Sequence, residues 1–170
     1  AFYGVPNLTN SEGLHTNAVY GFLNILFKVL DEEKADYLAV AFDLKAPTFR
    51  HKMFDAYKGT RKPMPEELHE QVPLMKEVLT AMGVPILTKE GYEADDILGT
   101  IAKREQKEGE EVSVVSGDRD LLQLSDTHIR ICLPKTSRGT TEVHNYYPED
   151  VIREYQVTPE QFIEVKALMG

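Results

Sequence analysis

The sequence predicts an α/β protein with a mostly parallel sheet flanked by helices. Segments with apolar residues three and four positions apart, typical of amphipathic helices, alternate with short apolar runs, typical of buried strands. Acidic residues follow these runs, as expected at the edge of a parallel sheet where ligands bind. At 170 residues, 42% of them hydrophobic and 28% charged, the chain has the size and composition of one soluble domain spanning residues 1–170.

Apolar residues at helical spacing between positions 19 and 30 predict the first helix. Thr16 or Asn17 can cap its start, and a charged segment ending at Lys34 closes it. Residues 37–42 then form a continuous apolar run without alternation. Such a run indicates a strand that is covered on both faces.

An apolar stripe over residues 68–82 predicts the second helix. Pro63 and Pro65 suit its start, Pro73 is expected to kink it, and Gly83 is expected to end it.

A strand over residues 84–87, a helix over 93–109 and a strand over 112–116 complete the alternation, which implies strands that run parallel.

The C-terminal part breaks this alternation. Residues 128–133 are typical of a strand, and the turn-rich residues 135–141 of a loop or hairpin. Two short helices are expected to begin at Pro148 and Thr158, each opened by a Pro-Glu pair. We therefore expect a helical region from about residue 148 onward.

The net charge of −9 argues at first against a polyanionic partner, but the charge is segregated along the chain. Residues 45–62 carry a net charge of +5, which leaves −14 for the remainder. This basic segment can bind nucleic acid if bound cations cover the acidic part, and it can equally be a solvated loop. Its basic residues are Lys45, Arg50, Lys52, Lys58, Arg61 and Lys62.

Cys132 is the only cysteine, and its apolar neighbours indicate core packing rather than a reactive thiol. No apolar run has the length of a membrane span, and the first ten residues do not resemble a signal peptide. We expect a monomeric, cytoplasmic protein that does not contact a membrane.

Acidic residues follow three predicted strands and should meet at one edge of the sheet. Oxygen ligands without His or Cys favour Mg²⁺ or Mn²⁺, and two or more such ions suit phosphodiester hydrolysis. Glu93 and Asp96 would share a helix face, and Asp95 could serve a second ion. Taken singly, acids in a first helical turn or a GDRD turn can be purely structural. The predicted ligands are Asp43, Glu93, Asp95, Asp96, Asp118 and Asp120.

Four long segments carry a resemblance to a known family, and they occur in the chain in this order: FDLKAPTFRHKMFDAYKGTRKPMPEEL, GYEADDILGTIA, VSGDRDLLQL and PEDVIREYQVTPEQF. They closely resemble the 5′-nuclease (5′-3′ exonuclease) domain of bacterial DNA polymerase I, within the flap endonuclease family. The resemblance implies a PIN-like fold that uses two divalent ions to cleave 5′ flaps and 5′ ends of DNA, including RNA primers, in replication and repair.

The resemblance also implies roles for particular residues. Residues 44–66 would be the family's helical arch or clamp, and the six acidic residues would bind the metal ions. A polymerase domain on the same chain would be a further partner. Arg50, Lys58 and Arg61 would be catalytic cations that contact phosphate, Tyr57 would stack on a base, and Lys62 would add to DNA binding.

Family members begin with a strand that carries another metal-binding aspartate, expected just before Ala1. They continue beyond Gly170 with an Asp-rich loop and a helix-hairpin-helix, so we expect a domain truncated at both ends. Two alternatives stay open: a PIN-type ribonuclease, which should not need the basic arch, and a non-catalytic nucleic-acid-binding module.

Overall fold

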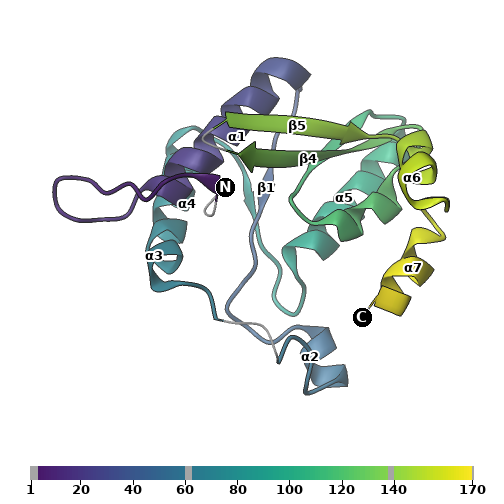
Figure 1. The fold of residues 1–170 in the computed structure, drawn as a ribbon, viewed down its shortest axis with the longest axis horizontal. Helices are drawn as coiled ribbons and strands as arrows, with labels where there is room; N and C mark the ends of the chain where they lie inside the picture. The colour runs from purple at the N-terminus through teal and green to yellow at the C-terminus, as the bar shows by residue number, and fades with distance from the viewer. Residues whose placement is uncertain (1–3, 60–62, 138–139, 170) are drawn as a thin grey trace. The chain divides into compact units, whose positions relative to one another are not determined.

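The structure is a computed structural model that describes residues 4–59, 63–137 and 140–169 (Figure 1). The chain forms two compact units. The first unit comprises residues 1–97 and 136–141, and the second comprises residues 98–135 and 142–170. The single domain expected from the sequence stays a prediction.

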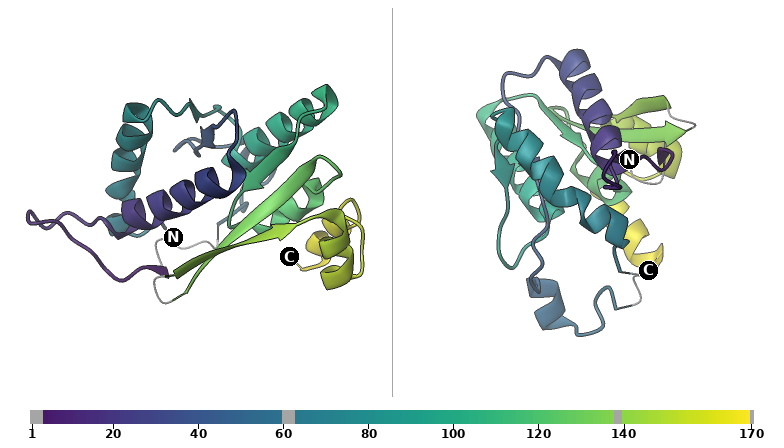
Figure 2. Two further views of the ribbon diagram at one scale, coloured as in Figure 1. Left: turned by 90° about the horizontal axis from the view of Figure 1, so that it is seen from above. Right: turned by 90° about the vertical axis from the view of Figure 1, so that its left-hand side faces the viewer.

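Among its described residues, the first unit contains a short parallel pair of strands and four helices that lie wholly within it. The strands are registered with Val40 opposite Ile86 and Ala41 opposite Leu87. α1 packs against α4 (Figure 2), and α4 also contacts β2. The elements are α1 (Asn17–Glu33), β1 (Val40–Ala41), α2 (Phe49–Met53), α3 (Glu66–His69), α4 (Gln71–Ala81) and β2 (Ile86–Leu87).

The second unit is built on a sheet of strand order β3-β4-β5. β3 and β4 run parallel, with Val114 opposite Ile131, whereas β4 and β5 run in opposite directions as a hairpin (Figure 1). The elements are α5 (Ala94–Glu108, whose first turn belongs to the first unit), β3 (Val112–Val115), the 3-10 helix η2 (Arg119–Leu124), β4 (Ile129–Ser137), β5 (Thr140–Tyr146), α6 (Pro148–Tyr155) and α7 (Phe162–Met169). The last two residues of β4 and the first two of β5 belong to the first unit.

The core of the second unit lies against one face of β4. Alternate residues of this strand, Ile129, Ile131 and Leu133, point into it, as the two-residue period of a strand requires. Ala102 of α5, Leu122 of η2, Val151 of α6 and Phe162 of α7 fill the same core. Cys132 is fully buried, as its apolar neighbours predicted.

The α/β class and the parallel strand pairs are confirmed, but the strands are arranged and bounded differently from the prediction. Hydrogen bonds between the described strands form two sheets, of two and three strands. The run 37–42 is a strand only at Val40–Ala41, and Tyr37 is 90% exposed. Pro85 accepts a hydrogen bond from Val40 but has no N–H to donate, so the ladder cannot extend through it.

The helix predicted over residues 68–82 is divided into α3 and α4, with the break at Glu70. Pro73 explains the position of the break, because it has no N–H to donate to the carbonyl of His69 one turn earlier. α6 begins at Pro148 as predicted, but α7 begins at Phe162 rather than Thr158. Phe162 donates to the carbonyl of Thr158, and turns occupy the residues between them.

The hairpin, one of the two predicted alternatives, is formed by β4 and β5, and its second strand continues to Tyr146, beyond the predicted end at residue 141. Residues 138 and 139 lie outside the described residues. Within the described ranges, no helix combines the length and apolar character needed to cross a membrane.

The start of α1 is capped by a side chain from α4 and not by either residue that the sequence suggested. Thr16 occupies the N-cap position without a side-chain cap bond, and Asn17 is the first helical residue. Instead, Gln71 Oε1 accepts from the backbone N–H groups of Ala18 and Val19, at 2.7 and 3.2 Å. Gln71 is fully buried, so it satisfies two of the helix's unpaired donors where water cannot.

Replacing Gln71 with Met is expected to lower the free energy of unfolding by about 2–3 kcal/mol, because Met retains the volume but leaves buried N–H groups without an acceptor. Urea unfolding followed by circular dichroism measures this change. Gln123→Met is the matched control, since Gln123 makes an exposed hydrogen bond. Equal stability of the two variants would contradict the capping role.

Candidate metal and nucleic-acid site

Asp43 connects the end of β1 to the start of α5. It lies two residues beyond Ala41, the last residue of the strand, and its Oδ1 accepts a hydrogen bond from Ala94 N at 2.7 Å. Because Ala94 is the first residue of α5, the carboxylate satisfies a donor at a helix start. The predicted placement of Asp43 just beyond a strand is confirmed.

Glu93 and Asp96 lie next to one another at the start of α5. Asp96 Oδ2 accepts from Glu93 N at 2.9 Å, and the two side chains are 15% and 22% exposed. Both carboxylates contact Arg50, but Glu93 immediately precedes α5, so the two residues do not share a helix face as expected. Asp95 lies in the first turn of the same helix, and the binding of a second ion by Asp95 stays a prediction.

Basic side chains of the predicted arch lie against these two carboxylates. Arg50 donates to both oxygens of Asp96 at 2.7 Å and lies 3.7 Å from Glu93. Lys58 Nζ lies 2.7 Å from Glu93 Oε1, and the Tyr57 hydroxyl donates to Glu93 Oε2 at 3.2 Å. The residues expected to contact phosphate therefore neutralise the residues expected to bind metal.

Local contacts explain how Arg50 reaches the carboxylates. Phe49 N, at the start of α2, donates to the carbonyl of Gly91, two residues before Glu93. Thr48 and His51 form a reciprocal capping box at the same helix start. These bonds connect α2 to the loop that precedes α5, so the side chain of Arg50 lies directly against the start of that helix.

α2 ends at Met53, and the arch is not helical at Lys58. Lys58 lies in a turn with a φ of 56°, a left-handed conformation that does not continue a helix. Arg61 and Lys62, predicted to bind DNA, lie outside the described residues.

Electrostatic effects in this cluster keep Asp96 ionised. The hydrogen bonds from Arg50 lower the pKa of Asp96, against a smaller opposing effect of burial. Burial, followed by the nearby Glu93 carboxylate, raises the pKa of Tyr57, so its hydroxyl stays protonated and donates.

In metal-free protein, Arg50→Met is expected to reduce stability near pH 7 and to have little effect in acid. The folded-state pKa of Asp96 is lowered, so the pair stabilises the fold above the unfolded pKa of about 4, and this contribution is lost as the pH falls through the folded-state value. Because the Arg50 side chain is about one-third exposed, we expect the substitution to lower the free energy of unfolding by only about 1 kcal/mol at pH 7. Urea unfolding with EDTA at several pH values measures it, and a difference that grows in acid would contradict this account.

The aspartates of the GDRD turn lie in the second unit, just beyond β3. Asp118 Oδ1 accepts from Asp120 N at 2.9 Å and caps η2. Asp120 Oδ1 lies 2.8 Å from Lys166 Nζ of α7. Leu121 and Leu122 follow as buried core residues, so the turn is fixed directly to the core.

The predicted ligands form one acidic group at the start of α5, in the first unit, and another at the GDRD turn, in the second unit. Within the ranges that the structure describes, no three Asp, Glu, His or Cys side chains lie close enough together to hold a metal ion. Convergence of all six predicted ligands stays a prediction. The donor chemistry nevertheless suits Mg²⁺, which usually binds through one or two carboxylates and completes its shell with water and substrate phosphate. The pair Glu93 and Asp96 and the pair Asp118 and Asp120 both meet that requirement.

Two residues near the acidic turn were not singled out from the sequence. Lys166 is paired with Asp120, and Arg119 is bonded to Glu154 of α6 at 2.8 Å. Arg119 stands inside the GDRD motif, so its position could have drawn attention. Lys166 lies 46 residues from Asp120 in the sequence, and no local pattern predicts their contact.

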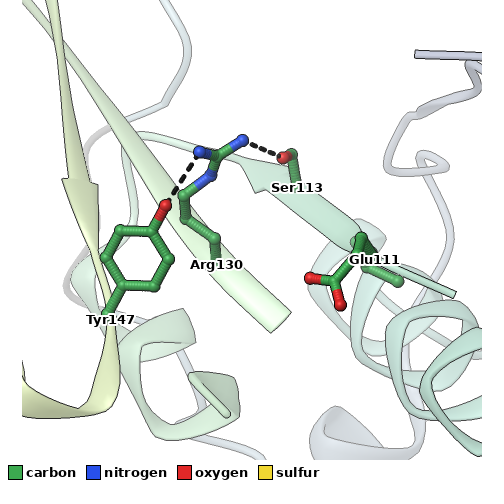
Figure 3. Close-up of a pocket in the computed structure, with 5 residues that line it drawn as sticks. Glu111, Ser113, Arg130 and Tyr147 are labelled. Carbon is green, nitrogen blue, oxygen red and sulfur yellow. Dashed lines mark hydrogen bonds between the residues drawn. The ribbon is translucent and has the colours of Figure 1, made fainter. Parts of the chain in front are cut away.

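A polar pocket of about 250 Å³ also lies in the second unit. Arg130 donates to Tyr147 Oη and to Ser113 Oγ, both at 2.9 Å, across this pocket (Figure 3). Ser113 and Arg130 face each other near the starts of β3 and β4, so the pocket is at the other end of β3 from the aspartate turn. Its lining residues are Glu111, Val112, Ser113, Arg130 and Tyr147.

Parallel strand pairs followed by acidic loops place this chain in the class of α/β domains that bind ligands beyond the carboxyl ends of their strands. Residues 1–156 match the 5′-3′ exonuclease, N-terminal resolvase-like domain family, and the chain belongs to that family.

Similar proteins agree with this assignment. The chain is 49% identical over its whole length to DNA polymerase I of Bacillus caldotenax and to that of Bacillus subtilis, and it spans 19% of each relative's length. A bacteriophage T5 protein co-crystallized with metal ions has a similar fold, with a TM-score of 0.70 and 26% identity over 89% of this chain and 59% of that one. The resemblance seen in the sequence is confirmed.

Proposed function

We propose that this domain is a divalent-metal-dependent, structure-specific 5′ nuclease. It would hydrolyse phosphodiester bonds in 5′ DNA flaps and 5′ ends, including RNA primers, during replication and repair. The observation that carries the proposal is the contact of Arg50, Tyr57 and Lys58 with the carboxylates of Glu93 and Asp96. Membership of the 5′-3′ exonuclease family supports it.

The carboxylates would hold two or more Mg²⁺ or Mn²⁺ ions. When bound, such ions lower the pKa of a water molecule and stabilise the leaving oxygen of an in-line phosphoryl displacement. The metal ions crystallized with the similar T5 protein support this assignment. The residues proposed to hold the ions are Asp43, Glu93, Asp95, Asp96, Asp118 and Asp120.

The basic residues would exchange carboxylate partners for phosphate. Arg50 uses two guanidinium nitrogens for the two oxygens of Asp96, and the same geometry fits two oxygens of a phosphate. Lys58 would place a positive charge where negative charge develops during cleavage. Tyr57 offers an aromatic face on which a base could stack. Arg61 and Lys62 are also proposed to bind DNA.

The proposed partners are DNA with a 5′ flap or 5′ end and an RNA primer on DNA. The similar DNA polymerase I proteins are about five times longer than this chain, so we also propose that a polymerase domain is attached to it. A monomer in the cytoplasm is consistent with this role.

A cleavage assay separates this proposal from its alternatives. The full-length protein is incubated with a 5′-flap duplex and with single-stranded RNA, with Mg²⁺ or with EDTA. Flap cleavage that EDTA abolishes is the expected result. Binding without cleavage would favour a non-catalytic module, and cleavage of the RNA alone would favour a PIN-type ribonuclease.

A further inference from the structure

Arg119 separates the two aspartates of the GDRD turn, and its side chain contacts α6. Its Nη1 donates to Glu154 Oε1 at 2.8 Å and also to the Tyr155 hydroxyl. Glu154 Oε2 accepts a second hydrogen bond, from the Tyr146 hydroxyl at 2.7 Å. The guanidinium also lies 6.0 Å from the centroid of the Tyr146 ring. The turn is therefore connected to both β5 and α6.

These groups have complementary protonation states. The hydrogen bond from Arg119 lowers the pKa of Glu154, so this carboxylate is ionised at neutral pH. Burial, followed by the hydrogen bond to Glu154, raises the pKa of Tyr146, so its phenol remains a donor. A carboxylate held between a cation and a phenol keeps one orientation.

The turn is thus held from two directions. Leu121 and Leu122 place the middle of η2 in the core, and Arg119 fixes its first residue to α6. The Arg119 and Glu154 side chains are 52% and 42% exposed, and ion pairs of this exposure add little to stability. The network therefore restrains the direction of the turn, whereas the core residues provide its stability.

We propose that Arg119, held by Glu154 and Tyr146, is a positioning residue that orients the carboxylates of Asp118 and Asp120 for metal binding. This inference rests on the proposed function. In this role Arg119 would touch neither ion nor substrate. It acts through the backbone on either side, because residues 118 and 120 are its immediate neighbours. Removing a residue that orients metal ligands without binding the metal itself commonly changes the metal affinity.

Mn²⁺ binding to the full-length protein tests the proposal, with free Mn²⁺ measured by electron paramagnetic resonance. Arg119→Met and Glu154→Gln should each raise the Mn²⁺ dissociation constant by about 2- to 5-fold, because an exposed network can bias the turn by no more than its own small interaction energy. The double variant should resemble either single variant, because both substitutions remove the same contact. Arg119→Lys should recover part of the affinity, since Lys keeps the charge and one donor.

Arg153→Met is the matched control. Arg153 precedes Glu154 on α6, carries the same charge and pairs with Asp150 on the surface. It should bind Mn²⁺ with wild-type affinity. The Mn²⁺ concentration for half-maximal flap cleavage should follow the dissociation constants across all the variants.

Wild-type Mn²⁺ affinity in Arg119→Met would overturn the proposal, as would additive effects in the double variant. A lower unfolding temperature in Arg119→Met than in Arg153→Met would mean that lost stability could explain a change in Mn²⁺ affinity. Tyr146→Phe then tests the positioning role, because it removes one hydroxyl of the network and keeps the ring. Unchanged Mn²⁺ affinity in Tyr146→Phe would then overturn the role. Failure of the wild-type protein to cleave any flap with Mg²⁺ would instead reject the proposed nuclease function, and it is measured separately.

Discussion

Asp118→Asn is expected to abolish cleavage while DNA binding is retained or becomes tighter. The substitution removes an anionic metal ligand and some repulsion of the phosphate. It should not disturb the turn, because the Asn side-chain oxygen can still accept from Asp120 N, as Asp118 Oδ1 does at 2.9 Å. We expect the single-turnover rate on a 5′-flap duplex to fall by at least about 100-fold.

Single-turnover kinetics and fluorescence anisotropy with labelled flap DNA measure these two properties. Asp126→Asn is the control, since Asp126 is also an aspartate of the second unit but pairs with Lys103 and Thr127. It should cleave at the wild-type rate. Normal turnover in Asp118→Asn would refute its role as a metal ligand.

Lys58→Ala is expected to lose most of the cleavage rate with the fold retained. A cation near the scissile phosphate stabilises charge that develops in the transition state, and its removal should cost about 100-fold or more. Glu93, the partner of Lys58 at 2.7 Å, would keep its contacts with Arg50 and Tyr57, so no isolated charge remains. The free energy of unfolding should therefore change little.

Single-turnover rates at saturating enzyme isolate this effect from binding, and circular dichroism checks the fold. Lys52→Ala is the control, because Lys52 is an exposed basic residue on α2 of the same arch. A loss of binding alone, with unchanged single-turnover rates, would show that Lys58 only contributes to the general attraction of DNA.

Long periodic segments could be predicted from the sequence alone. The helix ending at Glu33 and the helix with Asp95 and Asp96 in its first turn lie where their apolar spacing and end residues indicated. Such signals are local, because each turn of a helix carries its own pattern. The predicted lengths of β1 and β2 were wrong, because the ends of a strand depend on its partner strand. Pro85 has no N–H to donate, and this limits the ladder only once the pairing of the two strands is known.

The candidate site was predicted as a set of residues but not as a set of contacts. The pattern of acidic residues after strands correctly placed Asp43 and the start of α5. It gave no indication that Arg50 would pair with Asp96, 46 residues away, or that Gln71 would cap α1 across 53 residues. Contacts of this kind arise from packing between elements, and no spacing rule within one element encodes them.

A crystal structure of the full-length protein grown with Mn²⁺ tests the central claim most directly, because anomalous scattering locates the ions. We predict ions about 2.0–2.3 Å from carboxylate oxygens, with Glu93 or Asp96 and Asp118 or Asp120 serving the same metal centre. Ions bound elsewhere, or the carboxylates of Glu93 and Asp118 facing separate surfaces, would contradict it.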